Sequence, residues 1–198
     1  MKLSVRKRLA LIAAAQQEFI EHGYAGANMD RVCERAATSK RTLYRHFASK
    51  EVLFVASIQA VLAEQQAKLQ IRYEPSVAIE SQLKAYLLAK LETIHEDFGL
   101  PLARMVISEF IRSPALVGRY LEKFDHHDEQ LDAWFAHAIA DGKVKALAPT
   151  VMSSMLLCLL KGHLMWPQLI TNQALPDSLG QERIIDDILD VFLNGYRA

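Results

Sequence analysis

The stretch NMDRVCERAATSKRTLYRHFASKEVL, residues 28–53, decides how the first part of the chain folds. Asn28 is a residue type that caps helices, and small or apolar side chains then recur at the spacing of one helix face. Ala37 and Thr38 leave room for no more than a tight turn before Ser39, a second capping residue. Two short helices joined by so tight a turn are typical of a helix-turn-helix, whose second helix can enter the major groove of DNA.

The second helix of this pair has cations on one side and apolar side chains on the other. At about 100° per residue, Leu43 and Phe47 fall together and are expected to face inward. Arg41 and Arg45 fall on the opposite side with Thr42 beside them, where such side chains can reach base edges. An ordinary surface helix with solvated charges is the alternative, but it does not explain why neither the turn nor this helix contains an acidic residue.

The side chains that flank the predicted base-reading side are suited to phosphate contacts. Lys40 and Tyr44 lie along one edge of the helix, and His46 lies along the other. Ser49 is placed to cap the following helix, which puts Lys50 at an N-terminus where the helix dipole and free N–H groups favour a phosphate. The second helix is therefore expected to read bases at its centre and to hold phosphates at its edges.

The net charge of the chain is zero, but the charges are distributed unevenly. Residues 1–50 carry ten lysine and arginine side chains against four acidic ones, a net charge of +6. Residues 51–198 carry thirteen against nineteen, a net charge of −6. A basic segment joined to an acidic remainder favours contact between the first segment and a polyanion such as DNA.

The same residues resemble the TetR family of one-component transcriptional regulators. The resemblance is carried by Phe19, HGY at 22–24, residues 28–53 and the basic lead-in Arg6-Lys7-Arg8. Further along, the segments SEFIRSP, DGKV and LLKGHLMW are similar to the ligand-binding bodies of that family, in particular to its AefR-like branch. The resemblance implies a repressor that binds a palindromic operator as a homodimer and is released by a small-molecule effector.

The resemblance also implies roles for individual residues. Residues at the start of the second helix would face bases, residues at its edges would hold phosphates, and Asn28 would anchor the upstream helix to the DNA backbone. Nine residues are therefore predicted to bind DNA: Asn28, Ser39, Lys40, Arg41, Thr42, Tyr44, Arg45, His46 and Lys50.

The turn departs from the family pattern at Ala37, where many members have Gly. If the turn requires a left-handed backbone there, Ala37 costs on the order of 1 kcal/mol relative to Gly. The pair Lys40-Arg41 is also bulkier than the frequent Lys-Gly. It favours a guanine-directed site, because Arg pairs bidentately with guanine.

Almost the whole chain is predicted to be helical, because strand-like alternation is nearly absent and the few Gly and Pro residues fall at plausible helix breaks. The predicted helices are 4–22, 28–36, 39–46, 50–72, 76–97, 101–112, 114–140, 151–170 and 181–196, and two helices with a break near 125 are the alternative for 114–140. The expected fold class is all-α. A three-helix helix-turn-helix head is expected at residues 1–50, and a larger helical ligand-binding and dimerisation body at residues 51–198.

Two stripes in the predicted body are suited to pairing with a second copy of the chain. One helix places a small residue at every fourth position, which lets another helix approach closely, and the last helix repeats large apolar residues at helical spacing. Because TetR-like proteins pair their last two long helices, we predict that both stripes contact the partner in a homodimer; filling a monomer's core is the alternative. The predicted interface residues are Ser154, Cys158, Gly162, Ile185, Ile188 and Phe192.

The effector is expected to bind inside the body and to change the spacing of the two heads. Aromatic and methionine side chains with few fixed charges favour an apolar or aromatic compound, although each could equally belong to the core. His163 in particular could be a core histidine with a satisfied hydrogen bond. The candidate pocket residues are Tyr86, Met105, Phe110, Trp134, His163 and Trp166.

No cofactor, metal site or catalytic centre is predicted. The histidine-rich segments FDHHDEQLD and ETIHEDF lack the His-x-x-x-His spacing of a strong metal motif, and there is no Gly-rich phosphate loop or nucleophile elbow. Cys33 and Cys158 are expected to be free thiols. The remaining alternative is a helical small-ligand-binding protein or enzyme whose basic head is incidental.

The predicted location is the cytoplasm, without a membrane partner. The first nineteen residues resemble a secretory signal, but LALIAAA is at the short limit for its apolar region and also fits an amphipathic helix that Gly23 would stop. An exported protein with a cleaved N-terminus is the alternative. No apolar run approaches the ~18–20 residues that a membrane span requires.

Overall fold

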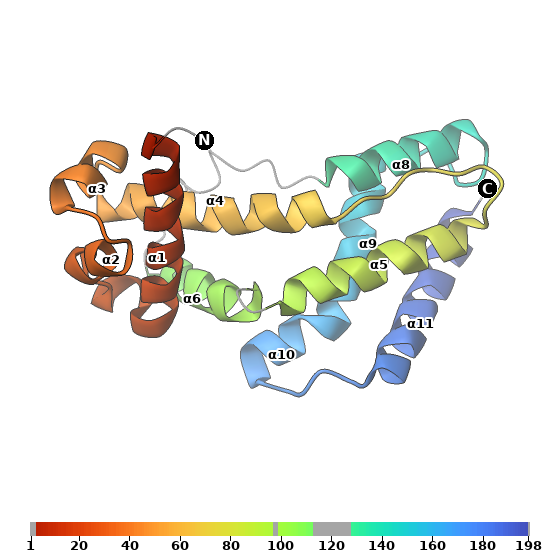
Figure 1. Ribbon diagram of the computed structural model, residues 1–198. Helices are drawn as coiled ribbons and strands as arrows, with labels where there is room; N and C mark the ends of the chain where they lie inside the picture. Colours follow the sequence, from red (N-terminus) through yellow and green to blue (C-terminus); the bar gives the residue numbers. More distant parts are fainter. Residues whose placement is uncertain (1–2, 97–98, 113–127, 198) are drawn as a thin grey trace. The chain divides into compact units, whose positions relative to one another are not determined.

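The computed structural model describes residues 3–96, 99–112 and 128–197, and helices dominate these residues (Figure 1). Apart from an isolated bridge between Val144 and Arg197, the described residues contain no β-structure. The helices are α1 (Leu3–Gly26), α2 (Met29–Arg35), α3 (Lys40–His46), α4 (Lys50–Lys68), α5 (Ile79–His95), α6 (Gly99–Arg112), α8 (Glu129–Ala140), α9 (Pro149–Leu164), α10 (Trp166–Thr171) and α11 (Ser178–Tyr196). The predicted all-α class is confirmed.

The chain divides into two compact units. The first, called the head, comprises the described residues within 1–65 and 97–124; the second, called the body, comprises those within 66–96 and 125–198. The head thus contains α1, α2, α3, most of α4 and α6. The domain boundary that the sequence predicted after residue 50 coincides with the first residue of α4, and the structural division comes later in the same helix.

The core of the head is built around α1. Its buried face contributes Leu11, Ile12 and Phe19, and α6 packs against this helix with Leu102 and Val106. Burying one such large side chain contributes about 1.5–3 kcal/mol, so this core is sufficient to fix three short helices that would be marginal alone. The apolar run that resembles a secretory signal thus forms part of a folded core, and α1 loses helical geometry at Gly23, where the sequence predicted its end.

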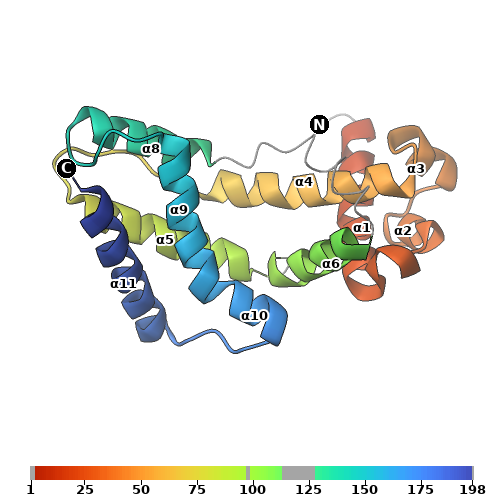
Figure 2. The same ribbon diagram turned by 180° about the vertical axis from the view of Figure 1, so that it is seen from behind.

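The body has its own core, formed by α5, α8, α9 and α11 (Figure 2). The helix α9 packs against α8, α11 and α10. It buries the face that carries Met152, Leu156, Leu160 and Leu164, which recur at every fourth position. The opposite face of α9, which carries the small residues predicted to contact a second copy of the chain, is exposed in the single chain.

A single helix predicted from 151 to 170 is two helices in the structure. The helix α9 ends at Leu164, Met165 has φ −135° and ψ −54°, and α10 begins at Trp166. The cause is Pro167, which has no N–H and whose ring would collide with the carbonyl four residues earlier in a continuous helix. The chain therefore restarts with Pro167 in the first turn of α10, the helix position that proline tolerates.

The helix predicted at 114–140 is described only in its last part. Residues 113–127 lie outside the described residues, and these include Asp125, His126 and His127 of the histidine-rich segment. The helix α8 begins at Glu129 and is capped by Asp128, whose carboxylate accepts from the Leu131 N–H at 3.2 Å.

Candidate nucleic-acid interface

The helix α2 is fixed at both ends by hydrogen bonds close in sequence. At its start the side chain of Asn28 accepts from the Asp30 N–H at 2.7 Å, which is the predicted N-cap. At its end the Thr38 N–H donates to the Cys33 carbonyl at 2.9 Å and the Ala37 N–H donates to the Glu34 carbonyl at 3.1 Å. These two bonds define a Schellman motif, in which one residue after the helix takes a left-handed conformation.

Ala37 is that left-handed residue, with φ +46°. The Schellman motif usually places Gly there, because a Cβ is unfavourable at positive φ. The turn therefore requires a left-handed backbone at this position, and the chain has alanine there. Ala37 is exposed, so its methyl group gains little from burial in return.

The helix α3 presents two different faces, as predicted. Leu43 and Phe47 are 0% and 1% exposed and belong to the head core. Arg41, Tyr44 and Arg45 are exposed, and none of their three side chains has an ion pair or hydrogen bond among the described residues. Since arginine is the residue that most often reads guanine in the major groove, this free face has the chemistry of a base-reading surface.

The start of α3 is more ordered than its exposed face. The Ser39 hydroxyl accepts from the Thr42 N–H at 3.3 Å, and it lies 3.0 Å from the Thr42 hydroxyl. The ammonium of Lys40 forms an ion pair with Asp30 at 2.6 Å, although both side chains are exposed. Three of the predicted DNA-binding residues are thus held by contacts at the beginning of the two helices.

Lys50 and His46 were expected to contact phosphates, but their polar atoms lie against other parts of the head. The ammonium of Lys50 donates to the carbonyls of Ala25 and Ala27, at 3.2 and 2.7 Å, and lies 4.9 Å from the ring centre of Tyr24. Burial lowers the pKa of Lys50. The Nε2 atom of His46 is buried and has no hydrogen-bond partner among the described residues. In this structure both residues face the head itself more than the surrounding solvent.

A buried carboxylate, which the sequence analysis did not single out, joins α1 to α2. Glu18 is 0% exposed, and its Oε1 accepts from the Asn28 N–H at 2.8 Å and from Arg31 at 2.6 and 2.8 Å. Burial alone would raise the pKa of Glu18, but the bonds from Arg31 and the Asn28 amide hold it below its usual value. Glu18 thereby holds the N-terminus of α2, where the predicted DNA anchor Asn28 lies.

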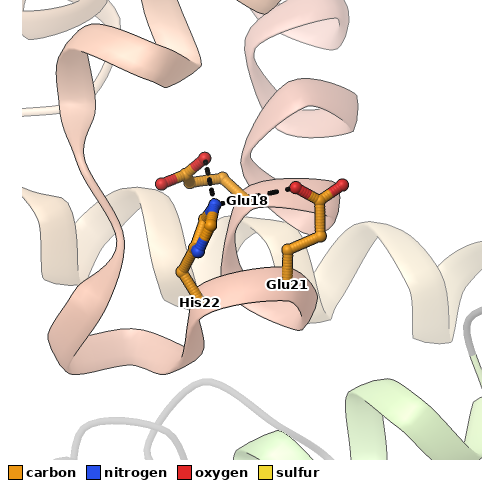
Figure 3. Close-up of side chains that lie close together, drawn as sticks. All are labelled: Glu18, Glu21 and His22. Atoms are coloured by element: carbon orange, nitrogen blue, oxygen red, sulfur yellow. Dashed lines mark ion pairs between the residues drawn. The ribbon is translucent and has the colours of Figure 1, made fainter.

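Glu18 also belongs to a group with Glu21 and His22 (Figure 3). The Nε2 of His22 lies 3.8 and 3.7 Å from the two carboxylates, and one ligand atom from each residue falls within 4.8 Å of the others. Both carboxylates already bind an arginine, Glu18 through Arg31 and Glu21 through Arg35. The group is therefore part of an ion-pair network that fastens α2 to α1.

The six candidate pocket residues are not gathered in one place. Met105 is buried in the head core and Phe110 packs against it. Tyr86 and Trp134 are buried in the body core, where the indole N–H donates to Gln82 at 3.0 Å and the Tyr86 hydroxyl donates to Asp128. His163 and Trp166 are exposed, so the alternative that His163 is a core histidine is wrong.

Two grooves of the body can be described, and none of the six candidates lines either. One, of about 460 Å³, is lined by residues 75–80 together with Gly142, Lys143 and Arg197. The other, of about 330 Å³, lies between α5 and α11, and its charged side chains are largely paired, as Lys84 is with Asp186 at 2.8 Å.

The candidate interface residues of the body fall into two classes. Ile185, Ile188 and Phe192 are 0%, 5% and 2% exposed and lie in the chain's own core, which is the alternative that the sequence left open. Ser154, Cys158 and Gly162 are exposed on α9. The large apolar side chains that share this exposed face are Val151 and Met155, at 45% and 44% exposure.

The capped helices, the Schellman turn and the cationic outer face of α3 together define a helix-turn-helix protein of the DNA-binding class. Comparison with known proteins narrows the class. Residues 11–57 match the family model described as bacterial regulatory proteins, tetR family, and residues 81–198 match the AefR-like transcriptional repressor C-terminal domain. The chain therefore belongs to the TetR family, and it is a transcriptional regulator with a helix-turn-helix head.

Curated relatives agree with this assignment. The transcriptional regulator UidR of Escherichia coli K12 is 30% identical over 153 residues, which cover 76% of this chain and 75% of UidR. SrpR of Pseudomonas putida is 27% identical over 139 residues, which cover 69% of this chain and 63% of SrpR. The chain thus spans less than two thirds of the length of SrpR. Both relatives are HTH-type transcriptional regulators.

Solved structures give the same fold. A TetR family regulator from Pseudomonas syringae pv. tomato DC3000 is 33% identical with a TM-score of 0.79, and the match covers 97% of both chains. The Flavonoid-responsive Regulator FrrA is 26% identical with a TM-score of 0.79 and the same coverage. Within the described part of the chain, no single helix is long and apolar enough to cross a membrane. Taken together, α3 and α4 have sufficient length and apolar composition, but they are bent by 68° relative to each other.

Proposed function

We propose that the protein is a homodimeric repressor that binds a palindromic operator through α3 and is released by a small hydrophobic effector bound in the body. The observation that carries the proposal is the free outer face of α3. Arg41, Tyr44 and Arg45 have no partner among the described residues, while Leu43 and Phe47 fix the helix from below. A helix held by two buried side chains can keep its cations free for DNA.

The proposed contact surface keeps the nine predicted residues. Arg41, Thr42 and Arg45 would face bases, and Tyr44 would reach a phosphate. Asn28 is exposed and its side-chain carbonyl is used in capping, so its N–H₂ group is left for the DNA backbone. The surface consists of Asn28, Ser39, Lys40, Arg41, Thr42, Tyr44, Arg45, His46 and Lys50, of which His46 and Lys50 would have to turn outward from their present surroundings.

The proposed dimer uses the exposed face of α9. TetR-family regulators act as dimers, and a dimer with two heads suits half-sites ~34–36 Å apart. On α9, the small residues Ser154, Cys158 and Gly162 lie beside exposed Val151 and Met155. A Cβ added at Gly162 would meet nothing within 4 Å inside the chain, so a partner helix has room to approach there. Ile185, Ile188 and Phe192 would support this face from the core.

The proposed repressor role and the proposed effector are each supported by one comparison. The repressor role is supported by the AefR-like repressor domain that matches residues 81–198. An aromatic effector is supported by the similarity to FrrA, which is described as flavonoid-responsive. We place its binding in the body and the action of the protein in the cytoplasm, where operator DNA is found. The helix α4 begins in the head and ends in the body, which suits it to transmit the effector signal.

Selection of bound duplexes from a random DNA pool tests the proposal. The wild type is expected to enrich a palindrome, and the double variant Arg41→Ala/Tyr44→Ala is expected to enrich nothing, because it loses the free groups of α3. Arg183→Ala on α11 is the matched control, since it removes an exposed arginine from the body. Enrichment of the same palindrome by the double variant would show that another surface reads the DNA.

A further inference from the structure

The ion pair between Lys40 and Asp30 lies where the two helices of the helix-turn-helix begin. Lys40 is the first residue of α3, and Asp30 lies in the first turn of α2. Their charged atoms are 2.6 Å apart, while the side chains are 60% and 51% exposed. The pair is therefore a surface contact between the anchoring helix and the DNA-reading helix.

Asp30 is itself held in place by the capping of α2. Its backbone N–H donates to the Asn28 side chain at 2.7 Å, and the Asn28 N–H donates to buried Glu18 at 2.8 Å. A chain of short contacts thus runs from the core of the head, through the N-terminus of α2, to the ammonium of Lys40. Lys40 has a long flexible stem, and an untethered lysine of this kind would sample many rotamers.

We propose that Asp30 is a positioning residue for DNA recognition, which holds the Lys40 ammonium at one point beside the base-reading face of α3. The inference rests on the proposed role of α3 in reading the operator. A lysine held in one place before binding loses less conformational entropy when it meets its partner on the correct sequence. This partner is a base edge, as the family resemblance implies for residues at the start of α3. Other sequences do not present that base edge at the same point, so the tether gives no advantage there.

The carboxylate of Asp30 has a second effect, which is opposite in sign. DNA is a polyanion, so an exposed negative charge at the interface weakens binding to every sequence. Asp30 therefore lowers the affinity for random DNA and, through Lys40, raises the affinity for the operator. Both effects increase discrimination between the two.

The two effects are separated by measuring Asp30→Asn on two duplexes, the palindrome selected by the wild type and a random sequence of equal length. Relative to a variant that only removes a surface carboxylate, Asp30→Asn should bind the palindrome about two- to fivefold more weakly for each head, the range of an exposed ion pair, and it should bind the random duplex more tightly than the wild type does. Glu34→Gln is the matched control, since it removes one exposed carboxylate from the same helix without touching Lys40. It should tighten binding to both duplexes alike.

The background variant Lys40→Met completes the experiment. There Asp30→Asn should act as Glu34→Gln does, with equal tightening on both duplexes. If Asp30→Asn changes both affinities by the same factor in the otherwise wild-type protein, Asp30 is no more than a repelling charge and the inference is overturned. If the wild type itself binds both duplexes equally, the proposed operator function fails first. Unchanged thermal midpoints would show that all variants are folded.

Discussion

Replacing Ala37 by Gly is expected to stabilise the head, even though the substitution removes a side chain. Ala37 has φ +46°, and an L-residue in the left-handed region costs roughly 1–2 kcal/mol. Glycine avoids this cost, but it also gives the unfolded chain more freedom, which takes back about 0.4–1 kcal/mol. The net expectation for Ala37→Gly is therefore a gain of about 0.5–1 kcal/mol.

Ala36→Gly is the control at the neighbouring position. Ala36 has φ −83°, which alanine adopts without strain, and its side chain packs against the head core. Here glycine gains nothing in the folded state and still loosens the unfolded chain, so this variant should lose about 0.5–1 kcal/mol. Two alanine-to-glycine changes one residue apart are thus expected to have opposite signs.

Native-state hydrogen exchange is the suitable assay, because a chain of two units need not unfold in one transition. The amides of Ala36 and Phe47 donate to Val32 and Leu43 at 3.0 and 2.8 Å, and they report on α2 and α3. Ala37→Gly should raise their protection by about two- to fivefold, the equivalent of about 0.5–1 kcal/mol. Equal or lower protection in Ala37→Gly than in the wild type would refute the strain that we assign to Ala37.

Two further substitutions test contacts that hold the head and the proposed dimer. Glu18→Gln should destabilise the head by about 1–3 kcal/mol, because Arg31 loses its buried partner. Because the pKa of Glu18 is lowered in the folded head, the stability that its carboxylate contributes is present above pH 4.5 and is lost as the pH falls through the folded pKa. Denaturation measured at decreasing pH should therefore show a loss of unfolding free energy in the wild type that Glu18→Gln does not show. Gly162→Leu should stabilise the isolated body by about 1 kcal/mol through helix propensity while it weakens dimerisation. Dimerisation is measured by sedimentation across a concentration series, with Ala136→Leu on α8 as the control. If Gly162→Leu and Ala136→Leu both dimerised like the wild type, the exposed face of α9 would not be the dimer interface.

The local features of the head could be predicted from the sequence because each depends on residues close together in the chain. Asn28 and Ser39 cap their helices as expected, and Leu43 and Phe47 face inward. The strain at Ala37 was also foreseeable, since a tight turn between two helices has few solutions. Short-range hydrogen bonds and helical periodicity are sufficient for all of these.

Contacts between residues far apart in sequence could not be predicted in this way. Glu18 stands in an otherwise apolar face of α1, and that position was a signal that it needs a partner, but periodicity does not identify Arg31 as the partner. The same holds for Lys50, whose position at a helix start suggested a phosphate, whereas its ammonium binds the carbonyls of Ala25 and Ala27. The position of a charged residue on a helical wheel gives the direction of its side chain, but it does not give the distance to a partner group.

The body shows a second limit of sequence patterns. Periodicity identifies an apolar face, but it does not say whether the chain itself or a second copy covers that face. For α11 the chain covers it, because Ile185, Ile188 and Phe192 pack in the core. For α9 the chain covers Met152, Leu156, Leu160 and Leu164, while Ser154, Cys158 and Gly162 are exposed beside Val151 and Met155. Small residues are a weak hydrophobic signal, so the exposed face of α9 stands out only when the core has been assigned.

The ion pairs and hydrogen bonds within the head determine how much of its positive charge is available to DNA. Arg31, Arg35 and Lys40 form ion pairs within the head, and Lys50 binds backbone carbonyls. Counting ten cations in the first fifty residues therefore overstates the charge that the folded head offers to DNA. The exposed arginines of α3, Arg41 and Arg45, keep their positive charges without a partner among the described residues. Folding thus leaves the positive charge available to DNA on the arginines of α3 and on Arg6, Lys7 and Arg8 of α1, and this makes the assignment more specific than the net charge of +6 could.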